Sequence, residues 1–358
     1  MSRPANAKKR PQTVTMQDVA DLVNVSKQTV SAVINNKPGI TEATRERVLA
    51  AIEQLGYRLD HTAQSLRTGR TRTIALFITD VSSPVASKMA SVAEDCAYAA
   101  QYTLVLYNTR DDVKREASYI DSAIQRSVDG ALFVATRDDT TALDSLQAAG
   151  LPVVVLDRVP NSYTGPAVHL DNKRAGAVAA EHLVSLGHTR IAHVAGPESI
   201  HISAERRDGF CERLRAQGFD ASTPCIERAE GWSIECGYEA MRRLLECDAD
   251  FTAVLCAGDM LAIGAARALR EAGRRIPEDV SLMGIDDIDL ASYTHPSLTT
   301  VSQSIGEMAR QAVHMLLELL EGKGPEQTRV VIEPTLVVRE STAAPPPGWD
   351  PRSSSQSG

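Results

Sequence analysis

Short apolar runs alternate with longer stretches of helical periodicity from Thr73 onward, and this alternating series occurs twice. We expect strands at 73–79, 103–107, 130–135, 152–157, 167–170, 190–195, 252–257 and 279–286. We expect helices at 84–100, 112–126, 140–149, 172–186, 203–217, 259–272 and 304–321. Strands that alternate with helices indicate βαβ units and a parallel sheet. The α/β body therefore forms two Rossmann-like parallel-sheet subdomains with a ligand cleft between them.

The ends of these strands predict where a ligand binds. In open α/β sheets, ligands lie beyond the carboxyl ends of the strands. Four carboxylates stand at such ends, namely Asp80, Asp157, Asp259 and Asp286. Carboxylate oxygens accept hydrogen bonds from pairs of sugar hydroxyls. Capping of the following helix is an equally good explanation for Asp80 and Asp259.

Charge is distributed unevenly along the chain. Residues 1–72 contain twelve Lys and Arg and six Asp and Glu, whereas the remainder contains 26 basic and 40 acidic residues. A basic amino-terminal part suggests a polyanionic partner, because basic side chains that neutralise phosphates release counterions. The alternative is a solvated basic arm with no partner.

The basic part also has the signals of two short helices joined by a tight turn. Thr15 and Asp18 form a variant of the capping box at the first helix. Asn24 accepts a left-handed turn, and Ser26 is a second N-cap. Helices joined in this way form the helix-turn-helix, whose second helix enters the major groove.

A third helix follows in the basic part. It begins near Thr41 or Thr44 and ends at Gly56, which stands at the C′ position. We expect four of its side chains to point inward: Val48, Leu49, Ile52 and Leu55.

Two patterns give this region a family resemblance. Residues 25–35 read V-S-x-x-T-V-S-x-V-I-N, and residues 41–57 read T-x-x-T-R-x-x-V-x-x-A-I-x-x-L-G-Y. With these motifs the chain resembles the lactose/galactose repressor family of bacterial transcription regulators over residues 15–340. The resemblance implies a repressor that binds a near-palindromic DNA operator as a homodimer. It also implies control by a small-molecule effector, which family precedent gives as a sugar or a sugar derivative.

The resemblance also assigns roles in DNA binding. Base reading falls to Lys27, Gln28 and Ala32, with Leu66 as a wedge in the minor groove. Phosphate contacts fall to Thr15, Ser26, Thr29, Ser31 and Asn35. Ala32 stands where many relatives have Arg, so we expect an unusual half-site at that step, with a thymine methyl packed on Ala32. Leu66 could instead pack against the body.

In the body, the resemblance adds three effector-binding residues. Arg206 and Asp286 match the effector-binding Arg and Asp, and Trp232 falls where an aromatic side chain often stacks on the ligand. Two departures point to an unusual effector. The common A-N-D motif reads Ala257-Gly258-Asp259, and the first loop reads S-S-P-V-A where S-N-P-F-F is frequent.

These observations define a domain plan. It consists of a basic arm (1–14), a helix-turn-helix head (15–58), a hinge (59–72), a body (73–342) and a disordered tail (343–358). Within the body, 73–170 and 303–325 form one subdomain, and 171–302 and 326–342 form the other. The tail lacks leucine heptads, which favours a dimer over a tetramer.

Several function classes lack their motifs. The first strand is followed by no glycine-rich loop, and no nucleophile elbow or Walker loop occurs, so we expect no enzyme and no cofactor. Four histidines lie between 182 and 201, but they lack metal-ligand spacing, and we expect no metal site. We expect no membrane span and no secretory signal, and six scattered cysteines fit a cytoplasmic protein. The alternative function is a solute-binding receptor with the same body and no DNA binding.

Overall fold

The computed structural model describes residues 14–34, 37–57, 69–219, 225–247 and 250–346. The chain divides into two compact units, a head (Met1–Thr71) and a body (Arg72–Gly358), which we describe separately. In the described parts of both units, no helix has the length and apolar character needed to cross a membrane.

The described residues of the head form three short helices around a small core. They are α1 (Met16–Leu22), α2 (Lys27–Ile34) and α3 (Glu42–Leu55). The capping box between Thr15 and Asp18 is confirmed, with the Thr15 amide donating to the Asp18 carboxylate at 2.7 Å. The left-handed turn at Asn24 (φ 52°) and the left-handed C-cap at Gly56 (φ 61°) are also confirmed.

One predicted core position in the head is wrong. Leu49 is 50% exposed, and Ala51 is buried beside Val48 instead. Residues three apart on a helix lie on the same face, whereas neighbouring residues point about 100° apart. Only one narrow face of α3 packs into the small core of the head, and Leu49 does not lie on that face.

The first sheet of the body contains six strands in the order β11-β5-β4-β3-β1-β2, all parallel. The strands are β1 (Thr73–Ile78), β2 (Thr103–Asn108), β3 (Gly130–Phe133), β4 (Val153–Leu156), β5 (Ala167–Leu170) and β11 (Arg329–Ile332). The helices of this subdomain are α5 (Pro84–Ala99), α6 (Val113–Gln125), α7 (Thr141–Ala148) and α12 (Ile305–Leu320).

The second sheet has six strands in the order β12-β10-β9-β8-β6-β7, and β12 is antiparallel to its neighbour. The strands are β6 (Ile191–Ala195), β7 (Cys225–Arg228), β8 (Ala253–Cys256), β9 (Ser281–Asp286), β10 (Thr299–Ser302) and β12 (Thr335–Val337). The helices are α8 (Asn172–Ser185), α9 (His201–Ala216), α10 (Ile234–Glu246) and α11 (Asp259–Glu271), and a 3-10 turn covers Asp289–Ser292.

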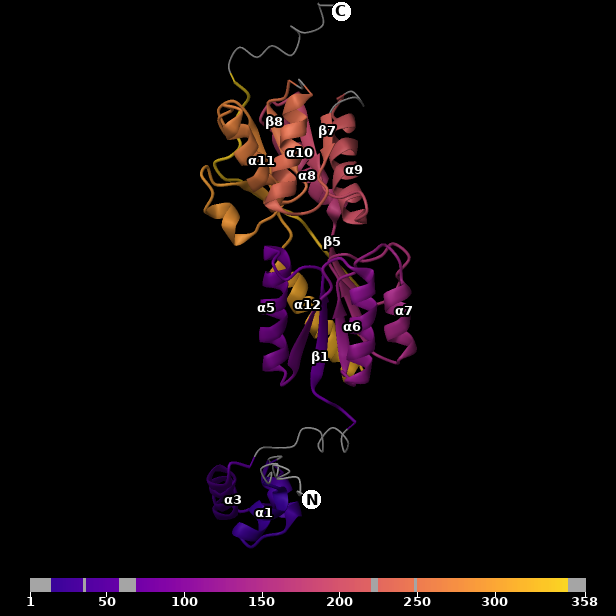
Figure 1. Cartoon of the computed structure of the whole chain (residues 1–358), viewed down its shortest axis with the longest axis vertical. Coiled ribbons are helices and arrows are strands. Elements are labelled where there is room, and N and C mark those ends of the chain that lie inside the picture. The colour runs from indigo at the N-terminus through magenta and orange to yellow at the C-terminus, as the bar shows by residue number, and fades with distance from the viewer. Residues whose placement is uncertain (1–13, 35–36, 58–68, 220–224, 248–249, 347–358) are drawn as a thin grey trace, which may run out of the picture. The chain divides into compact units, whose positions relative to one another are not determined.

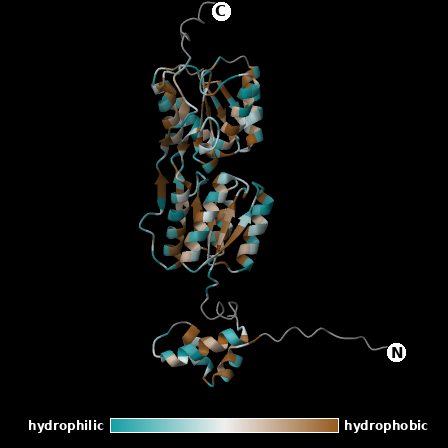
Figure 2. Cartoon of the chain, turned by 90° about the vertical axis from the view of Figure 1, so that its left-hand side faces the viewer, coloured by the Kyte–Doolittle hydropathy of each residue, from teal (hydrophilic) through white to brown (hydrophobic). Residues whose placement is uncertain are grey.

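Each sheet is covered by helices on both faces, which confirms the doubly wound α/β body. Alternate residues of β1 show why: Leu76 packs in one apolar core with α5 and α12, and Phe77 packs in another with α6 and α7. Figure 1 shows α5 beside α12, with α6 and α7 across the sheet. In Figure 2 the strands of the body are mostly coloured as hydrophobic, whereas hydrophilic and hydrophobic residues alternate along its helices.

The chain passes between the two sheets three times, after β5, after β10 and after β11. The third passage differs from the domain plan. β11 pairs with β5 in the first sheet, whereas the plan placed all of 326–342 in the second subdomain. β11 and β12 are only four and three residues long, and two residues separate them. Such short strands give too weak a sequence pattern to reveal that the chain changes sheets between them.

The predicted start of the tail is also corrected. Ala343, assigned to the tail, accepts a hydrogen bond at 2.8 Å from the ring of His188, and its amide donates to Ser281 Oγ at 3.0 Å. The ring of His182 bonds Thr342 at 3.0 Å. These two histidines therefore have structural partners, and the described residues contain no group of three or more potential metal ligands. Residues 347–358 lie outside the described part of the chain.

Candidate nucleic-acid interface and effector cavity

The first turn of α2 presents the predicted base-reading residues. Lys27 and Gln28 are exposed, whereas Val30 and Val33 on the opposite side of the helix are buried against α1 and α3. The Ser26 hydroxyl accepts a hydrogen bond from the Thr29 amide at 3.1 Å. This N-cap fixes the end of the helix at which Lys27 and Gln28 stand.

The predicted phosphate contacts have varied surroundings. The Ser26 and Thr29 hydroxyls lie 3.0 Å apart and share a hydrogen bond, and Thr15 caps α1. Ser31 is half-buried on α2. Asn35 and Leu66 lie outside the described residues, so their roles remain predictions.

The net positive charge of residues 1–72 does not come from the segment 14–57, which contains α1, α2 and α3. Residues 14–57 contain four basic and five acidic side chains. Residues 1–13 contain four basic and no acidic ones, and residues 58–72 contain four basic side chains and one acidic. We therefore expect attraction to DNA phosphates to come mainly from the segments on either side of residues 14–57.

Ala32 allows the predicted operator preference to be tested. It lies half-buried on α2, one turn beyond Gln28. We expect wild-type protein and Ala32→Arg to select different half-sites from a random duplex pool, because Arg bonds guanine in the major groove and Ala does not. Sequencing of the bound pools measures this, and identical half-sites would contradict it.

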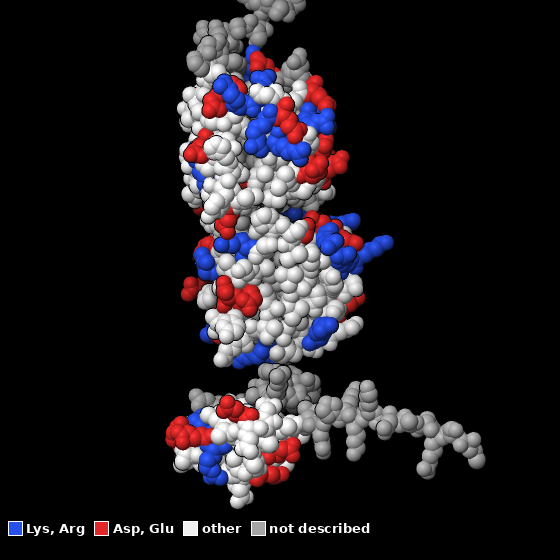
Figure 3. All heavy atoms as spheres, turned by 60° about the vertical axis from the view of Figure 1, so that its left-hand side comes forward, with Lys and Arg blue, Asp and Glu red and all other residues white. Residues whose placement is uncertain are grey.

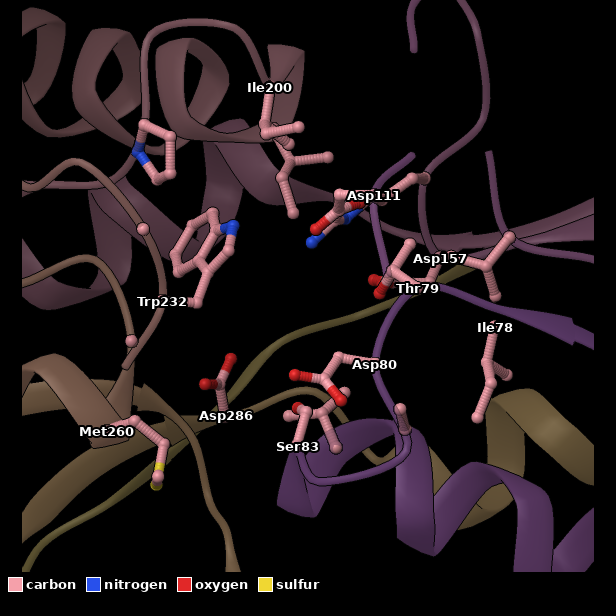
Figure 4. A pocket seen from close by; sticks show the side chains of 18 of the residues that line it. Ile78, Thr79, Asp80, Ser83, Asp111, Asp157, Ile200, Trp232, Met260 and Asp286 are labelled. Atoms are coloured by element: carbon pink, nitrogen blue, oxygen red, sulfur yellow. The ribbon is translucent and has the colours of Figure 1, made fainter. Parts of the chain in front are cut away.

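The body contains a cavity of about 360 Å³ between the carboxyl ends of its two sheets. Five of the six predicted effector residues line it: Asp80, Asp157, Arg206, Trp232 and Asp286. Figure 4 shows Asp80, Asp111 and Asp157 of the first subdomain and Trp232, Met260 and Asp286 of the second around one hollow. The strand-end rule thus locates the cavity from both sheets.

A hydrogen-bond network fixes the second subdomain's side of the cavity. Arg206 is 1% exposed, and its Nη1 donates to the Ala257 carbonyl at 2.6 Å and to Asp286 Oδ1 at 3.3 Å. Its Nε donates to Asn172 Oδ1 at 2.9 Å. Gln303 also donates to Asp286. Burial raises the pKa of Asp286 to about 6, although the Arg206 guanidinium opposes this shift.

The first subdomain contributes a second buried carboxylate to the cavity wall, that of Asp157. Asp157 and its neighbour Arg158 both line the cavity, and Asp157 has φ 63°. Asp286, which lines the cavity from the second subdomain, has φ 130°. Left-handed backbone costs roughly 1–3 kcal/mol in a residue with a Cβ and is concentrated at binding sites. Burial raises the pKa of Asp157, with Arg158 opposing it. Arg158 itself donates to Asp111 at 2.7 Å.

Asp259 is the predicted effector residue that the structure does not place on the cavity wall. Its carboxylate is fully buried and accepts hydrogen bonds from Thr300 Oγ1 at 2.6 Å and the Ile288 amide at 3.0 Å. Its own amide donates to Asp286 Oδ2 at 3.4 Å. Asp259 therefore holds the Asp286 loop in place, and direct contact with an effector is corrected to this supporting role.

Further lining residues were not predicted. Gln303 lies where the chain passes from β10 to α12, and Asp111 follows β2. Ser82, Ser83, Ser199, Glu230 and Met260 also line the cavity. The strand-end rule could have found Asp111, because the strand at 103–107 was predicted, but the strand before Gln303 was not.

Comparison with known proteins agrees with this architecture. Residues 15–60 match the family described as bacterial regulatory proteins, lacI family, and residues 180–342 match a periplasmic binding protein-like domain. The chain is 34% identical over 331 residues to the HTH-type transcriptional repressor PurR of Haemophilus influenzae, covering 91% of this chain and 98% of that protein.

Solved structures give the same result. The lac repressor dimer bound to operator and the anti-inducer ONPF superposes with a TM-score of 0.85 at 28% identity, over 93% of this chain and all of that one. The complex of the transcriptional regulator CelR with cellobiose has a TM-score of 0.70 at 32% identity, over 92% of this chain and 99% of that one. These relatives are regulators rather than enzymes, and a receptor without DNA binding would not explain the match at 15–60. The chain therefore belongs to the lacI family of bacterial regulatory proteins and is a DNA-binding transcriptional repressor with an effector-binding domain.

Proposed function

We propose that the protein binds a near-palindromic operator in the cytoplasm as a homodimer and responds to an uncharged sugar. The first turn of α2 carries this proposal, because it exposes Lys27 and Gln28 above a buried apolar face. Lys bonds guanine and Gln bonds adenine in the major groove. In the complex, Thr15, Ser26, Thr29, Ser31 and Asn35 contact phosphates, and Leu66 enters the minor groove.

The surface of the body supports the homodimer. Large apolar side chains are exposed on both subdomains, among them Tyr98 (77%), Leu290 (45%) and Tyr293 (83%). The face of the body drawn in Figure 3 has broad areas without charged side chains. The lac repressor in the superposed structure is a dimer on its operator. Two heads related by a two-fold axis require inverted half-sites.

The walls of the cavity support an uncharged sugar. Five carboxylates line it, Asp80, Asp111, Asp157, Glu230 and Asp286, against two guanidinium groups, Arg158 and Arg206. Both guanidinium groups are already bonded to carboxylates. The surplus carboxylates accept hydrogen bonds from hydroxyls and repel anions. CelR, whose structure is similar, was solved with cellobiose.

This charge balance predicts a preference within matched sugar pairs. We expect cellobiose, glucose or ribose to raise the melting temperature of the protein. The phosphorylated partners of two of them, glucose 6-phosphate and ribose 5-phosphate, should leave it unchanged, because their phosphate would be repelled by the surplus carboxylates of the cavity. Thermal unfolding at equal concentrations of each pair measures this. A larger shift with either phosphate would contradict the charge argument.

Operator control follows from linkage between the two sites. An effector that binds one arrangement of the subdomains more tightly shifts their equilibrium and changes operator affinity, typically by about 1–3 kcal/mol. The test is selection of duplexes by the full-length protein, followed by titration of the selected duplex with and without the sugars above. Enrichment of an inverted repeat that a sugar then modulates supports the proposal, and failure to prefer any inverted repeat over scrambled duplex refutes it.

A further inference from the structure

The strand β7 and the helix α10 form one βα unit at an edge of the second sheet. β7 is the last strand in the order of that sheet, and residues 229–233 link it to α10. Because this link is short, α10 runs back along β7, and the two elements pack together (Figure 1). The end of α10 therefore lies beside the start of β7.

Hydrogen bonds from Arg243 fix the position of α10 along β7. Its Nε donates to Glu227 Oε1 at 2.7 Å, and its Nη2 donates to the Arg228 carbonyl at 2.7 Å. Cys247 is the C-cap of α10, four residues after Arg243, and Cys225 stands two residues before Glu227. Four residues rise about 6 Å along a helix, and two residues span about 6.6 Å along a strand. The two cysteines therefore lie level with each other.

Both cysteine side chains also lie on the facing sides of these elements. Successive side chains of a strand point to opposite faces. Ile226 packs into the apolar core that contains α8 and α9, whereas Glu227 meets α10, so Cys225 shares the α10 face with Glu227. Cys247 lies about two helical turns after Ala240, which is fully buried in the core on that face. The two thiols therefore face each other between β7 and α10.

Solvent reaches both of these thiols. Cys225 and Cys247 are exposed, whereas Cys211 and Cys256 are buried. Partial burial raises the pKa of the Cys225 thiol, and the neighbouring Cys247 thiol raises it further. The pair thus combines closeness with access for a small reagent, which the two buried cysteines lack.

We propose that Cys225 and Cys247 form a modification site, a thiol pair that a peroxide oxidises to a disulfide. The Cys225 thiolate attacks one peroxide oxygen, the O–O bond breaks, and a sulfenic acid and one water form. The Cys247 thiolate then attacks the sulfenic sulfur, the S–S bond forms, and the second water leaves. The two sulfurs lose two electrons in total, and the peroxide gains them. The disulfide joins the end of α10 to the start of β7.

This site is separate from the proposed functions of the cavity and the head. The loop that links β7 to α10 contributes Glu230 and Trp232 to the cavity wall, and the thiol pair lies at the other end of the same unit. No effector or operator is needed to test it, so failure of the proposed function and failure of this inference are distinguishable.

The test is treatment of the full-length reduced protein with hydrogen peroxide. We expect free thiols, counted in denaturant, to fall from six to four, because two of the six cysteines are joined. The intact mass should fall by that of two hydrogen atoms, and peptide mapping by mass spectrometry should find Cys225 linked to Cys247. Dithiothreitol should restore all the thiols.

Substitutions identify the two partners. Cys225→Ser and Cys247→Ser should each abolish the link, and Cys247→Ser should leave a Cys225 sulfenic acid that dimedone traps. Cys236→Ser is the matched control, a half-buried cysteine in the first turn of α10, and it should keep the link.

Three results would overturn the proposal. They are oxidation of Cys225 without a link to Cys247, a link that survives in Cys247→Ser, and a link that joins two chains on a non-reducing gel. If a serine variant does not fold, peptide mapping of the wild-type protein decides.

Discussion

Arg206→Met is expected to abolish the response to effector and to lower the free energy of unfolding by about 3–5 kcal/mol. The arginine is 1% exposed and bonds Asn172, the Ala257 carbonyl and Asp286. Methionine fills much of the same volume but donates no hydrogen bond. The substitution leaves the Asp286 carboxylate buried without its cationic partner, at the wall where we expect the effector to bind.

The pH dependence of this loss distinguishes lost charge pairing from lost packing. Burial already raises the pKa of Asp286 to about 6 from its ordinary value of 3.8, and removal of Arg206 raises it further. A carboxyl group with a raised pKa binds more protons in the folded state, so its burial costs least at low pH and most above the folded pKa. We therefore expect the destabilisation to be larger at pH 8 than at pH 5, measured by urea unfolding.

Arg207→Met provides the matched control, because Arg207 is the next residue of α9 and pairs with its neighbour Asp208 at 2.7 Å. Its side chain is 27% exposed and does not line the cavity. We expect this variant to lose little stability and to keep its response to effector. Equal losses in the two variants would show that the network around Arg206 has no special role.

The effector cavity shows what sequence can and cannot predict about this protein. Asp80, Asp157 and Asp286 could be found because each stands at the end of a strand, or within two residues beyond it, and the apolar pattern reveals these strands. Asp259 follows the same rule, yet its side chain turns into the protein to bond Thr300 and Ile288. Position after a strand gives the edge of the sheet, but the direction of a side chain depends on partners that are distant in sequence.

Strands at the edges of the sheets were harder to predict. β7 reads Cys-Ile-Glu-Arg, contains no buried residue, and was missed together with α10, which follows it. β10, β11 and β12 are also short, and their pairing depends on where the chain passes between the subdomains. An edge strand buries little apolar surface, so the hydrophobic pattern that reveals central strands is weak there.

In the head, motif spacing predicted the helix caps correctly, but it did not predict which side chains of α3 are buried. The caps at Thr15, Ser26 and Gly56 follow from side-chain chemistry within three or four residues, and the structure has all three. Burial of the Leu49 side chain depended on which face of α3 packs against the other helices, and local sequence does not specify that face.

Gln28→Ala is expected to weaken specific operator binding by about 30-fold or more. A bidentate contact between a side chain and a base contributes about 1–3 kcal/mol, and a dimer makes it in each of two half-sites. Gln28 is exposed on α2, and its side chain makes no hydrogen bond with the described residues of the head, whose core comes from residues such as Val30 and Val33. The melting temperature should therefore remain unchanged.

Titration by fluorescence anisotropy against the selected operator and a scrambled duplex measures this effect. Because Gln28 is uncharged, we expect affinity for the scrambled duplex, and the slope of log affinity against log salt, to stay the same. Gln54→Ala is the matched control, an exposed glutamine on α3 outside the expected reading helix. An equal loss on both duplexes would mean that Gln28 contributes to general DNA attraction, and an unchanged operator affinity would remove it from the set of base-reading residues.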